Sequence, residues 1–172
     1  MSFGLRFTFN DGPLSSAIAA LRDRGEDLGA PLREIGEDMV TVAQRSFELH
    51  ASPQGVIWKP SWRAINEGGT TLVKSGRLRD FITYLVDAAA AAVEVGSNTF
   101  YARIHQLGGT IRAKGKALRF RLGKDTIFVK SVTLPPRPFI GASPTDVDRW
   151  ADIARDYVAG FGPSGARTGG TR

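Results

Sequence analysis

The chain has 172 residues, of which 42% are hydrophobic and 23% are charged, with no cysteine and a formal net charge of +6. This length fits one domain, since domains run roughly 100–200 residues, and the lack of cysteine excludes disulfides, thiolate nucleophiles and thiolate metal sites. The N-terminus lacks the pattern of a signal peptide and no apolar run approaches about 18 residues, so we expect a soluble protein made in the cytoplasm, with no membrane partner.

The N-terminal part is predicted to be one strand followed by two helices. Apolar residues alternate along residues 1–10, which indicates a strand with one apolar face. Pro13 favours the start of a helix that runs to Arg24. Apolar residues at spacings of three and four predict a longer helix from Pro31 to Leu49.

Residues 51–71 are predicted to be a loop, because their apolar periodicity vanishes and glycine and proline interrupt them. An unstructured loop of about 20 residues is unusual in a compact domain and is often functional. Trp58 and Trp62 lie inside it. Burial in the core and exposure at a partner interface are both open for these two tryptophans.

The second half is predicted to mix short helices and strands. A helix begins near Ser75 and runs to about Phe81, and another covers Thr99–Leu107 and is closed by Gly108 and Gly109. The expected strands are Ile82–Val86, Ala91–Gly96, Thr110–Ala113, Leu118–Leu122 and Thr126–Val132.

The C-terminal part is predicted to be an extended segment, a helix and a tail. Prolines keep Leu134–Pro138 extended, and a helix capped by Ser143 or Thr145 runs to about Ala159 with Trp150 facing inward. We therefore expect an α+β fold: a small antiparallel sheet with a basic β-hairpin, packed by the long helix near the N-terminus and by the C-terminal helix. Residues 1–161 form the single domain, and residues 162–172 form a flexible tail rich in glycine and arginine.

The excess positive charge lies in residues 109–134, which we call the basic arm. Leu118, Phe120 and Leu122 alternate with Arg119 and Arg121, which predicts a half-buried strand with a cationic face. That face is open to three interpretations: a solvated surface, a contact with an acidic neighbouring ring, or a contact with DNA phosphates in a channel. The basic residues of the arm, opposed only by Asp125, are Arg112, Lys114, Lys116, Arg119, Arg121, Lys124 and Lys130.

No motif for catalysis, nucleotide binding or metal binding is found, so we expect no catalytic residue, no cofactor and no metal. His50 and His105 lack neighbouring ligands at metal-binding spacing, and His105 is expected to make structural hydrogen bonds. Glu37 and Asp38 are expected on a solvated helix face. The glycine pairs lack the lysine and hydroxyl residue of a phosphate loop, and no nucleophile elbow occurs.

Five segments, taken in order, make the chain resemble the phage virion morphogenesis or tail-completion family, typified by the G protein of phage Mu. The segments are Pro53-Gln54-Gly55 with Trp58; Leu72 to Leu78; Val95-Gly96-Ser97; Tyr101 to Gly109; and Arg137 to Gly141. The residues that the resemblance marks as structural are Trp58, Gly76, Tyr101, His105, Gly108, Arg137, Pro138, Phe139 and Gly141.

The resemblance implies a non-catalytic protein of the virion neck or the top of the tail, made in the host cytoplasm. It implies a ring, commonly a hexamer, that contacts the tail tube and the head-completion or connector proteins, with genomic DNA passing through the lumen. The basic arm departs from the short family members. A partner face in that arm would comprise Arg112, Lys114, Lys116, Arg119, Arg121 and Lys124. The competing hypothesis is a small basic DNA-binding protein that acts through residues 109–134.

Overall fold

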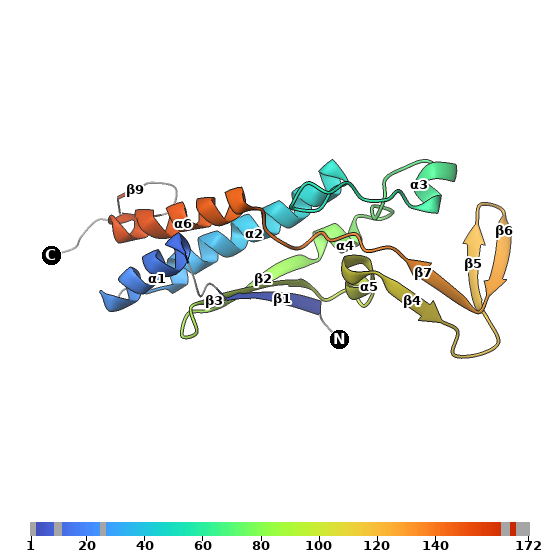
Figure 1. Ribbon diagram of the computed structural model, residues 1–172, viewed down its shortest axis with the longest axis horizontal. Helices are drawn as coiled ribbons and strands as arrows, with labels where there is room; N and C mark the ends of the chain where they lie inside the picture. The colour runs from blue at the N-terminus through green and yellow to red at the C-terminus, as the bar shows by residue number, and fades with distance from the viewer. Residues whose placement is uncertain (1–2, 9–11, 25–26, 163–165, 168–172) are drawn as a thin grey trace. The chain divides into compact units, whose positions relative to one another are not determined.

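The computed structural model describes residues 3–8, 12–24, 27–162 and 166–167 (Figure 1). Its mixture of helices and small sheets confirms the α+β fold class. The helices are α1 (Pro13–Asp23), α2 (Gly29–Leu49), α3 (Trp62–Asn66), α4 (Arg77–Asp80), α5 (Ala102–Leu107) and α6 (Pro144–Val158). The strands are β1 (Phe3–Thr8), β2 (Ile82–Asp87), β3 (Ala92–Ser97), β4 (Gly109–Arg112), β5 (Leu118–Leu122), β6 (Asp125–Val129), β7 (Ser131–Leu134), β8 (Phe161–Gly162) and β9 (Ala166–Arg167).

The chain forms two compact units. The sheet unit contains Gly4–Val42, Thr83–Gly96 and the described residues from Ala142 onwards, and the pocket unit is made mainly of Ala43–Ile82 and Ser97–Gly141. Helix α2 contributes its first part to the sheet unit and its last part to the pocket unit. The single domain over residues 1–161 stays a prediction. So does the flexible tail, because residues 163–165 and 168–172 lie outside the described residues, whereas β8 pairs with β9.

In the sheet unit, a sheet of order β1-β3-β2 packs against α2. The contact depends on Gly36, because a Cβ atom at that position would lie 2.3 Å from the ring atom Cδ2 of Tyr84 on β2. Any larger side chain at position 36 would therefore push the helix away from the sheet. Helix α1 packs on α6 in the same unit, burying Leu14, Ile18 and Leu21 of α1.

Helix α6 begins with a capping box and buries Trp150. The Ser143 side chain accepts a hydrogen bond from the Asp146 backbone, and the Asp146 carboxylate accepts one from the Ser143 backbone. Burial raises the pKa of Asp146. The hydrogen bonds from Ser143 and the pairing with Arg149 together lower it by more than burial raises it, so the pKa lies below its ordinary value. The inward position predicted for Trp150 is confirmed, since this side chain is fully buried.

The solvated face predicted for Glu37 and Asp38 is wrong for Asp38. Its carboxylate accepts hydrogen bonds from Arg149 Nη2 at 2.7 Å and from Trp150 Nε1 at 2.6 Å. The partners lie more than 100 residues away in the sequence, so only the folded chain brings them to the helix. Glu37 remains exposed.

The core of the pocket unit forms around three aromatic rings. The ring of Phe47, on the last part of α2, lies 5.5 Å from the ring of Trp58 and 5.3 Å from that of Phe139. Trp58 is buried and its Nε1 donates a hydrogen bond to the carbonyl of Pro138 at 2.9 Å. Of the two alternatives left open for Trp58, the structure shows the core, whereas Trp62 is 43% exposed.

Gln106 ties α5 to the segment that follows β7. Its Oε1 accepts hydrogen bonds from the backbone N–H groups of Phe139 and Ile140 at 2.9 and 3.0 Å, and its Nε2 donates to the Ile140 carbonyl at 2.6 Å. All three residues are buried. One side-chain amide thus satisfies backbone groups that water cannot reach.

The basic arm forms two successive antiparallel ladders. Strand β4 pairs with β7, and the predicted hairpin of β5 and β6 is confirmed. The single strand predicted over Thr126–Val132 is wrong, because this segment divides at Lys130 and its two parts pair with different strands. The carbonyl of Lys130 accepts a hydrogen bond from Ala113, where the two ladders meet.

The loop predicted over residues 51–71 needs correction. The loop contains α3, whose N-cap Ser61 accepts a hydrogen bond from the Ala64 backbone at 3.2 Å. A helix this short shows no periodicity in the sequence, so only its cap signals it. The helix predicted from near Ser75 to about Phe81 is present as α4, which is preceded by Gly76 in a left-handed conformation, with φ of 75°.

Candidate functional site

A cavity of about 680 Å³ lies in the pocket unit. Its walls come from the loop before α3, the segment leading into α4, helix α5, strand β7 and the segment after it. Three of the five segments that carry the sequence resemblance therefore meet at this cavity: those of residues 72–78, 101–109 and 137–141. The lining residues are Lys59, Pro60, Ser61, Trp62, Arg63, Leu72, Lys74, Ser75, Gly76, Arg77, Leu78, Tyr101, His105, Val132, Thr133, Leu134, Pro135 and Arg137.

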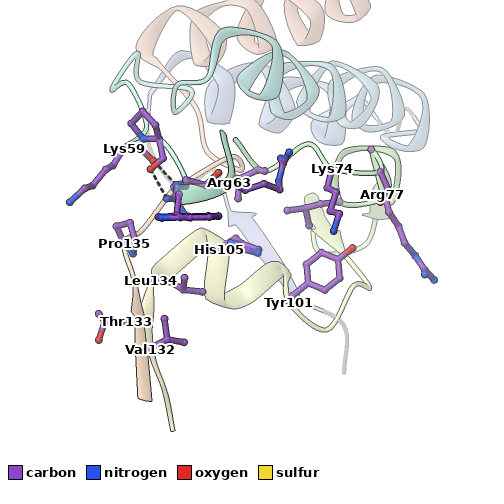
Figure 2. Close-up of a pocket in the computed structure, with 18 residues that line it drawn as sticks. Lys59, Arg63, Lys74, Arg77, Tyr101, His105, Val132, Thr133, Leu134 and Pro135 are labelled. Atoms are coloured by element: carbon purple, nitrogen blue, oxygen red, sulfur yellow. Dashed lines mark hydrogen bonds between the residues drawn. The ribbon is translucent and has the colours of Figure 1, made fainter. Parts of the chain in front are cut away.

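Figure 2 shows how these elements surround the cavity. His105 projects from α5 and Tyr101 from the residue just before this helix, and Val132 to Pro135 follow β7 and its continuation. Lys74 points toward Tyr101, whereas the end of Arg77 points away (Figure 2). Leu72 has a φ of 64°, which is rare for a side chain of this size and costs on the order of 1–3 kcal/mol. The wall of the cavity is therefore locally strained.

The lining carries several cations and, among the described residues, no carboxylate. Arg137 is only 5% exposed, and its Nε donates to the carbonyl of Lys59 at 2.8 Å. Arg63 also uses carbonyl acceptors, with Nη2 donating to Thr70 at 2.5 Å and to Val73 at 3.1 Å. Both guanidinium groups hold loops in place, and neither makes an ion pair with a described acid. Burial lowers the pKa of Arg137.

His105 stands beside this charge with one ring nitrogen unsatisfied. Its Nδ1 is buried and has no hydrogen-bond partner among the described residues, so the expected structural hydrogen bond is missing at that atom. The backbone carbonyl of His105 does accept a hydrogen bond from the Arg137 N–H at 2.8 Å. Burial, followed by the charge of Arg137, lowers the pKa of the imidazole, which favours its neutral form.

This shift makes the stability of the protein depend on pH. Below about pH 6.5, the ordinary histidine pKa, the unfolded chain takes up a proton that the folded His105 resists. The free energy of unfolding should therefore fall as the pH drops from 7.5 to 5.5, by no more than about 1.4 kcal/mol per pH unit for this one group. His105→Gln should flatten that dependence, as measured by urea denaturation at both pH values.

The control for this experiment is His50→Asn, at an exposed position with a φ of 52° that asparagine tolerates. It should leave the His105 contribution in place. The charged and titratable groups that line the cavity together with His105 are Lys59, Arg63, Lys74, Arg77, Tyr101 and Arg137. If His105→Gln and the wild type lose the same stability at low pH, another group causes the loss.

The remaining residues of the resemblance shape the backbone around the cavity. A Cβ at Gly108, whose φ is 68°, would lie 2.6 Å from the backbone nitrogen of Pro136, so only glycine fits there. Phe139 is buried in the core, and Gly141 lies beside the Gln54 side chain. These positions support the site and do not line it.

The structure does not bring the basic arm's candidate residues into the cavity. All six are exposed, and none makes an ion pair with a carboxylate of the described residues; they are Arg112, Lys114, Lys116, Arg119, Arg121 and Lys124. At the hairpin tip, the Gly123 N–H donates to the Glu67 carboxylate at 2.8 Å. The basic arm nevertheless adjoins the cavity: Val132 to Leu134 line one wall, and Arg121 shares a neighbouring pocket with Trp62, Arg63 and Lys74.

The sequence did not predict Lys59, Arg63, Leu72 and Lys74 as site residues. Leu72 and Lys74 belong to a segment of the resemblance, so their place in that segment was an available signal. Lys59 and Arg63 lie in the predicted loop, where nothing local marks them. Within the described part of the chain, no group of three or more metal-ligating side chains occurs, and no helix is long and apolar enough to cross a membrane.

Two of the comparisons with known proteins found a match. The profile of the phage virion morphogenesis family matches residues 9–159. The chain is 30% identical over 148 residues to a Haemophilus influenzae protein named Mu-like prophage FluMu G protein 2, across 86% of this chain and 88% of that protein. No solved structure matches. The matched range includes every residue that lines the cavity.

Proposed function

The chain belongs to the phage virion morphogenesis family and acts in phage virion assembly, and we propose that it completes the tail as a ring in the neck of a tailed bacteriophage. The family is one of virion assembly and is not a known enzyme family. In this proposal six copies form the ring, which contacts the tail tube on one side and the head-completion or connector proteins on the other. Genomic DNA passes through its lumen.

The observation that carries the proposal is the exposure of apolar and extended segments in the pocket unit. Ile57 is 79% exposed and Phe100 is 88% exposed, and Val56, Ile65 and Phe128 are also exposed. Among the described strands, β4–β7 and β5–β6 each form a sheet of two strands with open edges. Open edges and exposed apolar side chains invite pairing with another chain. A closed ring, in which each copy covers the next, satisfies them.

The proposal predicts the outcome of removing the protein from an infection. A phage with a stop codon early in this gene should produce DNA-filled heads and separate tails, as seen by electron microscopy of the lysate. Adding the purified protein to that lysate should restore joined, infectious particles, and heat-denatured protein should not. Native mass spectrometry should show a closed ring. Normal virions from the mutant, or a purified monomer that is missing from particles, would refute the proposal.

A second candidate function, DNA binding through the basic arm, has its own supporting observation: the arm's seven basic residues are all exposed, and none makes an ion pair with a described acid. Such binding would weaken steeply with salt: the logarithm of the binding constant falls with the logarithm of the salt concentration with a slope of about −0.9 per phosphate contact. The double variant Arg119→Gln, Arg121→Gln should then lose duplex affinity and keep head–tail joining. The matched control is Arg45→Gln, Arg103→Gln, which removes two exposed charges elsewhere. If the Arg119→Gln, Arg121→Gln variant loses head–tail joining but keeps its DNA affinity, the result favours the ring proposal over DNA binding.

A further inference from the structure

Arg137 is a buried cation whose charge no described carboxylate neutralises. Its two hydrogen-bond acceptors are the carbonyls of Lys59 at 2.8 Å and of Pro60 at 3.5 Å, the latter at the limit of a hydrogen bond. A guanidinium carries five N–H donors in a planar fork that matches a carboxylate. A buried charge without an opposite charge is strongly destabilising. An anion that binds Arg137 supplies the opposite charge that the fold lacks, so its binding is favoured.

The surroundings of Arg137 increase this preference for an anion. Lys59, Arg63, Lys74 and Arg77 line the same cavity, and the described lining contains no acid to offset them. Low-dielectric walls around charges of one sign focus their field into the cleft. His105 adds no charge to this field at neutral pH, because its pKa is lowered by burial and by Arg137.

The apolar part of the lining limits what kind of anion fits. The walls include Trp62, Leu72, Leu78, Val132 and Leu134. Inorganic phosphate has no apolar group that could pack against these side chains. The phosphates of duplex DNA lie on a wide polar rod that does not enter a cavity of about 680 Å³. A peptide segment with a carboxylate beside an apolar side chain satisfies both the guanidinium and the walls.

We propose that the cavity is a receptor for a short segment of another virion protein, in which an aspartate or glutamate pairs with Arg137 and a neighbouring apolar side chain packs on the walls. This extends the proposed function by giving the chemistry of one contact made in the neck, and it rests on that function for the identity of the partner as a virion protein. Lys59 and Lys74 attract the carboxylate, and Arg137 binds it.

Binding can be tested on the full chain with small probes that separate charge from shape. 4-Phenylbutyrate carries an apolar body and a carboxylate, 4-phenylbutanol is its neutral counterpart, and inorganic phosphate is the anion alone. In NMR titrations the acid should shift the Trp62, Tyr101 and His105 signals in a saturable way. Its affinity should exceed that of the alcohol and of phosphate by at least about tenfold. Equal affinities, tighter phosphate binding, or no saturable shift would overturn the proposal.

Two variants assign the binding to residues. Arg137→Gln should abolish binding of 4-phenylbutyrate, but it also removes the bond to the Lys59 carbonyl and can disturb the fold. Lys74→Gln avoids that risk, because Lys74 is exposed, and it should weaken the acid about threefold while leaving the alcohol unchanged. The matched control is Lys116→Gln, an exposed cation of the basic arm outside the cavity. Unchanged acid affinity in Lys74→Gln overturns the assignment.

A final experiment tests whether the partner is another virion protein. Lys74→Glu should leave the ring intact by native mass spectrometry and fail to restore head–tail joining in the mutant lysate. Normal joining would overturn the role of the cavity in assembly, and loss of the ring would show that the occupant is a second copy and overturn the assignment to another virion protein. If tail completion itself is refuted, the probe titrations still report on the cavity separately.

Discussion

Replacing Gln106 with leucine is expected to lower the free energy of unfolding by about 3 kcal/mol or more. The amide satisfies two backbone N–H groups and one carbonyl, at Phe139 and Ile140, and all of them are buried. Leucine fills the space but leaves these groups without partners, at about 1–3 kcal/mol each. Urea denaturation followed by tryptophan fluorescence measures the loss.

The matched control is Arg103→Leu, on the same helix but exposed. A surface change of this kind usually alters stability by less than about 0.5 kcal/mol. If Gln106→Leu behaves like Arg103→Leu, the three hydrogen bonds do not hold the segment after β7. The prediction would then be wrong, and the position of Arg137 at the cavity would have to depend on its own bonds to the loop at residues 59–60.

Replacing Asp38 with alanine should destabilise the sheet unit by about 2–3 kcal/mol. The change removes a carboxylate that accepts from the Arg149 guanidinium at 2.7 Å and from the indole of the fully buried Trp150 at 2.6 Å. The hydrogen bond to Asp38 is the largest of the causes that raise the pKa of Arg149 above its ordinary value. Because a guanidinium stays protonated without this partner, Asp38→Ala leaves the Arg149 charge facing an apolar side chain. Thermal unfolding and urea denaturation both report the change.

The neighbouring acid gives the control for Asp38→Ala. Glu37 is exposed and has one described hydrogen bond, from Tyr84 Oη at 3.3 Å, so Glu37→Ala should cost less than about 0.5 kcal/mol. Asp38→Asn should fall between the two, because the amide oxygen can still accept from Trp150 while the charge facing Arg149 is lost. Equal effects of Glu37→Ala and Asp38→Ala would contradict the structural difference between these acids.

The sequence predicted the elements whose signal is local. The stripe of apolar residues along α2 and the alternation along β5 each repeat with the period of one type of structure, and burial of one face selects that structure. Ser143 and Pro144 mark the start of α6 by their own chemistry. The fold class followed from these elements. The basic character of the arm follows from composition alone.

The errors fall where the deciding contact is distant in the sequence. Residues 126–132 look like one strand, but the chain changes partner at Lys130 because β4 and β5 are offset by the residues between them. Asp38 looks like its neighbour Glu37 until α6 places Arg149 beside it. Helix α3 has too few residues for a periodic pattern, and its cap Ser61 is one serine among many.

The sequence by itself determined that the chain folds as α+β, carries its excess charge in residues 109–134 and resembles the family to which it belongs. These properties depend on composition or on patterns among residues close in the sequence, so they can be determined without knowledge of the fold. Only the tertiary structure decided that Arg137 is buried against a carbonyl 78 residues earlier in the chain. It also decided that three of the five motif segments enclose one cationic cavity. A cavity is formed by segments that are distant in the sequence and meet only in the folded chain. Its lining, and the lack of a carboxylate in that lining, therefore cannot be predicted from any one segment.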